Sequence, residues 1–102
     1  TGNDLEMFHD GSNSYIENYT GDFIFTQALD DGDMIFKSDN GSGGTTEYFR
    51  VDGGAVKTIA SKNFAFIDGV KAEFGDSGDF QIYHSGSHSY IKDTGTGSLY
   101  KT

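Results

Sequence analysis

The chain contains the same sixteen-residue unit twice, and this repetition constrains its fold more than any other feature. Residues 4–19 read DLEMFHDGSNSYIENY and residues 79–94 read DFQIYHSGSHSYIKDT, with seven identical positions and no gap. Other positions carry similar side chains, such as Leu5 and Phe80. A unit used twice within 102 residues is typical of repetitive, elongated proteins rather than of one globular enzyme core.

Strand patterns fill most of the chain, and helix patterns are nearly absent. Short runs rich in Phe, Tyr, Ile and Val alternate with clusters of Asp, Gly, Ser and Asn, and no window shows sustained helical spacing. The absence of proline suits strands whose N–H groups are all needed for pairing. The sequence therefore predicts an all-β fold of short strands and hairpins. The expected strands cover residues 5–9, 14–17, 22–26, 33–37, 46–51, 55–59, 64–67, 70–74, 80–84, 89–92 and 99–101.

Each repeat is expected to form a hairpin followed by a third strand. The turns begin with Asp10-Gly11 in the first copy and Ser85-Gly86 in the second, and glycine supplies the positive φ that tight turns need. The chain is accordingly divided into a first hairpin repeat unit at residues 1–27, an intervening β-segment at residues 28–74, and a second hairpin repeat unit at residues 75–102.

The apolar content is low for a self-sufficient core. Leu, Ile, Val and Phe together make up 22 of 102 residues, near the level at which chains remain disordered. Nine phenylalanines and six tyrosines argue against disorder, because aromatic side chains bury a large area each. A small chain of this composition gains most by sharing its core with other copies of itself, so we expect it to oligomerise.

The charge and cysteine content exclude several classes of function. A formal net charge of −9 disfavours binding to nucleic acid and to anionic membranes. Without cysteine the chain has no disulfide, no zinc–thiolate site and no thiol nucleophile. No apolar run reaches membrane-spanning length, and Thr1 in place of Met suggests a piece of a longer chain.

Three stretches of the sequence resemble the repeats of tailed-phage tail fibres and virion structural proteins, especially those of marine and cyanobacterial phages. They are DLEMFHDGSNSYIENYTGDFIF, DDGDMIFKSDNGSGGTTEYFRVDGG and VKAEFGDSGDFQIYHSGSHSYIKDTGTGSLY. The second copy departs from the first at Ser85, where the first has Asp10, and at His88, where the first has Asn13.

This resemblance implies an intertwined homotrimeric β-fibre, of the β-prism or triple β-helix type. The fibre would project from the virion, contact other tail or baseplate proteins, and carry a tip that engages a host receptor or surface glycan. A segment of such a fibre would carry no catalysis. The net charge disfavours a nucleic-acid partner, and the lack of a long apolar run disfavours membrane insertion.

His9 and His84 are the candidate metal ligands. Each lies on the same alternation face as two apolar residues, at the same position of its repeat. If three chains wrap one axis with that face inward, three imidazoles meet and could hold a transition-metal ion such as iron on the threefold axis. The alternative is that each histidine ends a strand and bonds to the adjacent turn. His88 is expected to be an exposed turn residue.

Two acidic turns, at residues 30–33 and 39–41, offer the hard oxygen ligands that calcium prefers. Neither matches a known calcium loop, and Asp and Asn also favour turns for conformational reasons. Catalysis finds little support, because there is no Gly-x-Ser-x-Gly motif and short repeated hairpins form no deep cleft. We therefore expect a protein that is not an enzyme.

The repeated aromatic residues allow two interpretations. They could stack on sugar rings at an outer surface, or they could pack across strands as part of the scaffold. Doubling favours packing, because a scaffold must be rebuilt in every unit. A carbohydrate-binding β-sandwich that recognises a host glycan is the alternative to the fibre, and a depolymerising tailspike enzyme ranks below both. The aromatic positions are Phe8/Tyr83 and Tyr15/Tyr90.

Overall fold

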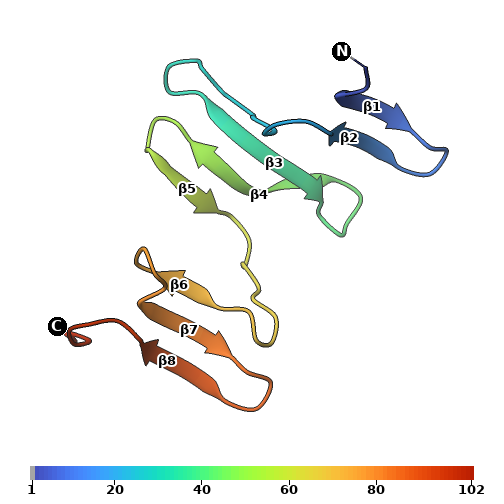
Figure 1. The fold of residues 1–102 in the computed structure, drawn as a ribbon. Coiled ribbons are helices and arrows are strands. Elements are labelled where there is room, and N and C mark those ends of the chain that lie inside the picture. The colour runs from blue at the N-terminus through green and yellow to red at the C-terminus, as the bar shows by residue number, and fades with distance from the viewer. Residues whose placement is uncertain (1) are drawn as a thin grey trace.

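The chain folds into three small antiparallel sheets joined by irregular segments, as a computed structural model shows (Figure 1). The structure describes residues 2–102, and Thr1, with which the predicted first unit begins, lies outside them. The sheets contain β1 (Leu5–His9) and β2 (Ser14–Asn18); β3 (Asp33–Asp39), β4 (Thr45–Asp52) and β5 (Lys57–Ala60); and β6 (Ala72–Phe74), β7 (Phe80–His84) and β8 (Ser89–Asp93).

The predicted all-β class is confirmed, because residues 2–102 contain strands and no helix. Accordingly, nothing helical in this range is long and apolar enough to cross a membrane. The third sheet joins both sides of the predicted boundary at residue 75, since β6 precedes that boundary and pairs with β7.

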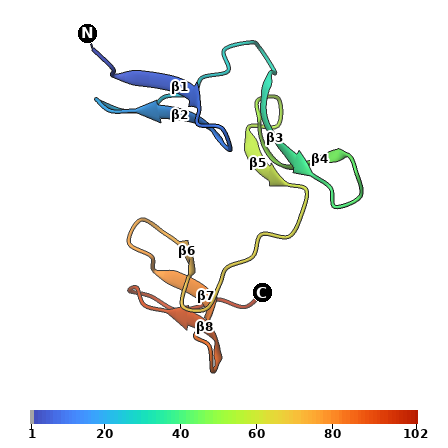
Figure 2. The same cartoon turned by 90° about the vertical axis from the view of Figure 1, so that its right-hand side faces the viewer.

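The three sheets lie apart from one another in both views (Figures 1 and 2). Within residues 2–102, no strand of one sheet contacts a strand of another. The radius of gyration is 19.0 Å, and the molecule measures 51 × 37 × 30 Å. A compact domain of this length has a radius of gyration of about 13 Å. The chain is therefore an open series of sheets rather than one packed domain.

No apolar side chain of residues 2–102 is buried. Met7 and Ile24, for example, keep 80% and 76% of their surface exposed. The accessible surface is 8582 Å², whereas a compact monomer of this mass exposes about 5,700 Å². Each sheet therefore presents its apolar side chains to the outside, and the chain by itself has no core.

The sequence repeat is also a structural repeat. Met7 pairs with Ile16 in the first hairpin and Ile82 pairs with Ile91 in the second, in the same register. The aromatic pairs one position further on, Phe8/Tyr15 and Tyr83/Tyr90, both stack with centroids 4.9 Å apart and planes 18° from parallel. Cross-strand aromatic contacts therefore recur with the same geometry in both copies.

The two turns reach the same conformation with different side chains. Asp10 Oδ1 accepts hydrogen bonds from the backbone N–H groups of the residues two and three further on, at 2.9 and 2.7 Å. Ser85 Oγ accepts the corresponding bonds at 3.2 and 3.1 Å. Gly11 and Gly86 follow with φ of 101° and 103°, a region that side chains disfavour. The substitution of Asp10 by Ser85 therefore preserves the turn.

Three predicted strands are wrong, because the segments at residues 22–26, 64–67 and 99–101 form no ladder. The other predicted strands are present with small shifts of their ends. A strand forms only where its N–H and C=O groups find partners. Within residues 2–102, no strand lies alongside any of these three segments to pair with its backbone groups. They remain apolar and exposed, with Phe64 at 65% and Tyr100 at 85%.

The repeated ring pairs predict how substitutions at Tyr83 behave. We expect Tyr83→Ala to lose the aromatic pair and to lower the free energy of unfolding by about 0.5–1.5 kcal/mol or more. Tyr83→Phe recreates the pair found in the first copy, so its effect should stay within about 0.5 kcal/mol. Urea denaturation followed by circular dichroism measures both. A Tyr83→Phe loss as large as that of Tyr83→Ala would show that the hydroxyl, not the ring, matters.

Candidate functional site

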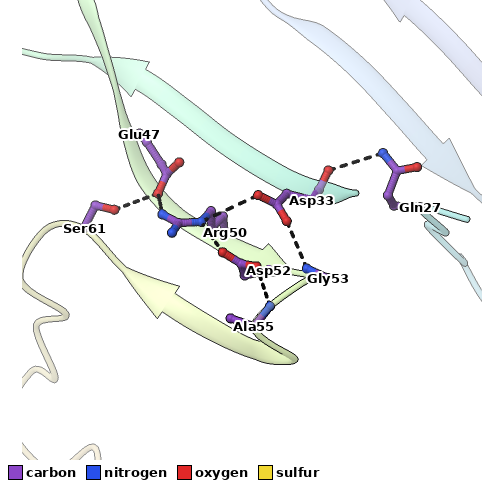
Figure 3. A network of polar contacts seen from close by, with 8 residues as sticks. All are labelled: Gln27, Asp33, Glu47, Arg50, Asp52, Gly53, Ala55 and Ser61. Atoms are coloured by element: carbon purple, nitrogen blue, oxygen red, sulfur yellow. Dashed lines mark hydrogen bonds and ion pairs between the residues drawn. The ribbon is translucent and has the colours of Figure 1, made fainter. Parts of the chain in front are cut away.

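The middle sheet carries the densest polar network of the described residues, centred on Arg50 of β4 (Figure 3). Its guanidinium donates to Glu47 Oε2 at 2.7 Å and to Asp52 Oδ2 at 2.9 Å, and Asp33 Oδ2 of β3 lies 3.8 Å away. The Ser61 hydroxyl, just after β5, donates to the same Glu47 oxygen at 2.7 Å. The network thus links β3, β4 and the end of β5.

A β-bulge makes this network possible. Arg50 and Asp52 are two residues apart and share a face, but Glu47 is three residues from Arg50. The register shifts between Phe36 and Lys37, so that Tyr48 has no opposite residue on β3. The extra residue turns Glu47 to the face of Arg50. The Tyr48 hydroxyl donates to the Asp39 backbone carbonyl at 2.6 Å.

The contacts shift the pKa values of the network in the directions expected for ion pairs. The pKa of Glu47 is lowered, first by the Ser61 hydroxyl and then by Arg50. The pKa of Asp52 is lowered, first by the Ala55 backbone N–H and then by Arg50. The pKa of Arg50 is raised by Glu47 and Asp52. The shifts of all three pKa values favour the charged forms, as expected for a network of ion pairs.

A groove of about 420 Å³ lies on the same sheet, lined by aromatic rings and two lysines. Phe36 and Phe49 stack with centroids 4.5 Å apart, and Phe64 meets Phe49 edge-on at 6.3 Å. Lys37 and Lys62, two of the seven cationic residues, also line the groove. This surface could accept a flat apolar group, with its lysines favouring one that carries negative charge. The sequence analysis missed the groove, although Phe36 and Phe49 in the predicted strands at residues 33–37 and 46–51 were a signal for it.

His9 and His84 occupy equivalent places at the ends of β1 and β7. The Nδ1 atom of His9 lies 3.1 Å from Ser14 Oγ, and that of His84 lies 2.9 Å from Ser89 Oγ. Both histidines are exposed, and they sit on separate sheets. The alternative interpretation expected a bond to the adjacent turn, whereas the partner is the serine that lies opposite each histidine on the return strand. The bond leaves Nε2 as the ring nitrogen that a metal would use, and the axial site of a trimer stays a prediction.

Within residues 2–102, no group of three or more His, Cys, Asp or Glu side chains could hold a metal ion. One carboxylate of each acidic turn accepts a backbone hydrogen bond. Asp39 Oδ2 accepts the Gly41 N–H at 2.8 Å, and Asp33 Oδ1 accepts the Gly53 N–H at 2.9 Å. His88 is exposed in its turn and meets the Tyr90 ring edge-on, with centroids 6.4 Å apart.

Comparison with known proteins adds no family assignment. No protein-family model matches the chain, and no curated protein or solved structure is significantly similar to it.

The charged network predicts an acid-sensitive middle sheet. Because the folded-state pKa values of Glu47 and Asp52 are lowered, their stabilising effect is complete above their ordinary pKa values, about 4, and is lost as the pH falls through the folded values. Arg50→Met should lower the thermal midpoint at pH 7. The midpoint of this variant should also fall less steeply between about pH 5 and pH 2, because Glu47 and Asp52 lose the cation that lowers their pKa values. The measurement is the midpoint by circular dichroism at each pH.

Lys101→Met is the control, because it removes one exposed cation from the last residues of the chain, outside the middle sheet. Lys57 is unsuitable, since it lies opposite Asp52 in the ladder. The pH profile of Lys101→Met should follow that of the unmodified protein. If the Arg50→Met and Lys101→Met profiles coincide, the Arg50 contacts do not stabilise the sheet.

Proposed function

We propose that this chain is a structural segment of a tailed-phage tail fibre, which supports attachment to the host surface and has no catalytic activity. It works as part of a homotrimer, on the virion, next to other tail or baseplate proteins. The observation that carries the proposal is the surface of the chain: three ordered sheets with aromatic side chains, and no buried apolar side chain among residues 2–102.

The missing core is a quantitative argument for self-association. The chain exposes about 2,900 Å² more than a compact monomer of its mass would. Obligate interfaces bury about 2,000–5,000 Å² summed over both partners and resemble a protein core. In a ring of three chains there is one interface per chain, so an excess of about 2,900 Å² per chain corresponds to about 2,900 Å² per interface. The excess therefore matches what a chain exposes when its core is completed by neighbouring copies. The number three comes from the resemblance to phage fibres.

The three sheets follow one another as separate units, which suits a particle built of successive modules. In Figure 1 the middle sheet lies between the β1–β2 hairpin and the β6–β8 sheet, and in Figure 2 it stands to one side of both. The unpaired segment at residues 22–26 leaves its aromatic side chains exposed, and Phe64 stays 65% exposed although its ring meets Phe49. The net charge of −9 supports solubility and gives no basis for nucleic-acid binding.

The groove of the middle sheet favours one alternative, a module that binds a host glycan. Its rings could stack on a sugar, and its two lysines would select an acidic one. The three sheets do not pack into a sandwich within residues 2–102, so this alternative rests on the groove and not on a β-sandwich fold.

Light scattering of the purified chain tests the fibre proposal. We expect a mass three times the 11.1 kDa of one chain, with a thermal midpoint that rises with protein concentration, because folding and association are coupled. A stable monomer that binds acidic oligosaccharides, and that loses this binding in Lys37→Ala with Lys62→Ala, would replace the proposal with the alternative.

The axial metal site has its own test. If His9 and His84 ligate iron on a threefold axis, elemental analysis of the oligomer will find iron that is lost in His9→Ala with His84→Ala. His88→Ala is the control, because His88 sits in the turn and should not change the metal content. An oligomer free of metal, with unchanged stability in the double variant, would leave the two histidines as hydrogen-bonding partners of the serines.

A further inference from the structure

The two repeats differ in one respect that the sequence does not explain. In the second copy, β7 pairs with β8 on one side and with β6 on the other. In the first copy, β1 pairs with β2 and has no strand on its other side within residues 2–102. The first hairpin therefore lacks the third strand that β6 supplies in the second copy, and the edge of β1 that would receive such a strand is free.

The missing third strand changes the burial of one repeated position, which is Gln81 in the second copy and Glu6 in the first. Gln81 of β7 is 8% exposed, and its Nε2 donates to Glu73 Oε2 of β6 at 2.9 Å. Glu6 is its counterpart on β1 and is only partly buried. A free strand edge offers N–H and C=O groups that readily pair with another strand.

The strand β8 also has a free edge, since it pairs only with β7. In antiparallel ladders, alternate residues direct both N–H and C=O to one side. The bonds of Tyr19 N–H to Asp4 O and of Thr94 N–H to Asp79 O fix this alternation in both hairpins. It follows that the outward groups belong to Leu5, Met7 and His9 on β1, and to Ser89, Ile91 and Asp93 on β8.

We propose that the free edge of β8 pairs antiparallel with the free edge of β1 in a second copy of this chain. Met7 lies opposite Ile91 in this register, and the combined sheet has the strand order β6–β7–β8–β1–β2. The proposal names the strands of the self-association on which the proposed function rests.

The three central pairs of side chains match in this register, and the outer pairs are Leu5 with Asp93 and His9 with Ser89. It sets Glu6 opposite Lys92, a favourable pair of charges, and joins Met7 to Ile91, which are 80% and 70% exposed in one chain. Phe8 comes to lie beside Tyr90, so the two stacked ring pairs become one row of four rings across the sheet. The same register already exists between β7 and β8, where the repeat counterparts of Glu6 and Met7 face the same two residues, Lys92 and Ile91.

Pairing of like strands matches less well. Two β1 strands centred on Met7 would set Glu6 against Phe8, and two β8 strands centred on Ile91 would set Lys92 against Tyr90. The β8–β1 contact joins different surfaces of the two copies, so it repeats from chain to chain. It closes into a ring of three or continues along a line of copies.

Disulfide cross-linking tests the pairing, because the chain contains no other cysteine. Opposite residues of such a pair have Cα atoms about 5.5 Å apart, within disulfide range. An equimolar mixture of Met7→Cys and Ile91→Cys chains is oxidised at a concentration where light scattering shows the oligomer. We expect a disulfide-linked product of twice the chain mass that contains both variants.

The control mixture is Ile16→Cys with Ile91→Cys. Ile16 lies opposite Met7 on β2, one strand further away, so about 10 Å would separate it from Ile91. This mixture should give no mixed product. An oligomer without the Met7–Ile91 disulfide, or Ile91→Cys chains that link to themselves instead, would overturn the β8–β1 pairing and leave the fibre proposal standing. A monomeric chain would overturn both.

Charge exchange provides a second readout. Glu6→Lys alone should weaken self-association about fivefold per contact, because the new lysine faces Lys92. Within its own hairpin the new lysine faces Glu17, which favours folding, so the loss cannot come from a damaged hairpin. Glu6→Lys with Lys92→Glu should restore the association. Asp76→Lys, in the β6–β7 turn, makes the same change in net charge and should have no effect, and failure of the double variant to recover would contradict the pairing.

Discussion

Cross-strand contact within each small sheet is the interaction on which this structure depends. With no buried apolar side chain among residues 2–102, the order of each hairpin comes from its ladder, its turn and its stacked rings. These contacts are local in sequence, so each sheet can form without the others. They leave both edges and most apolar side chains open, and an isolated small sheet is at best marginally stable in water. The exposed strand edges and apolar side chains are therefore also the reason why the chain would gain stability from contact with other chains.

The parts of the fold that the sequence predicted are those fixed by local chemistry. Both repeat hairpins were expected at nearly their observed bounds, because Gly11 and Gly86 mark the turns and alternating apolar residues mark the strands. The strands at 22–26, 64–67 and 99–101 were not formed, because a strand also needs an edge to pair with. Strand propensity is visible in a sequence, and the position of a partner edge is not.

The candidate sites show the same limit. The bonds of His9 and His84 to serines follow from hairpin register, whereas the sequence analysis had placed the alternative bond at the adjacent turn. The Arg50 network was missed, because it depends on the bulge after Phe36 that turns Glu47 toward Arg50. An extra residue in a strand leaves no clear mark in a periodic pattern. The groove on the opposite face of the sheet was missed for a related reason, since it needs Phe64 to return beside β4.

The difference between Glu6 and Gln81 shows how a repeat can be adapted to its surroundings. Gln81 lies opposite Glu73 of β6 and close to the β6–β7 turn, where a neutral amide can donate to Glu73 and to the Gly78 carbonyl. A carboxylate there would face Glu73 at close range and would be destabilising. Glu6 stands at an open edge, where a charge discourages pairing with strands of the wrong sequence. The same charge admits a strand that presents a cation, as β8 does with Lys92. A single side chain can thus keep the edge from indiscriminate aggregation and still select one partner strand.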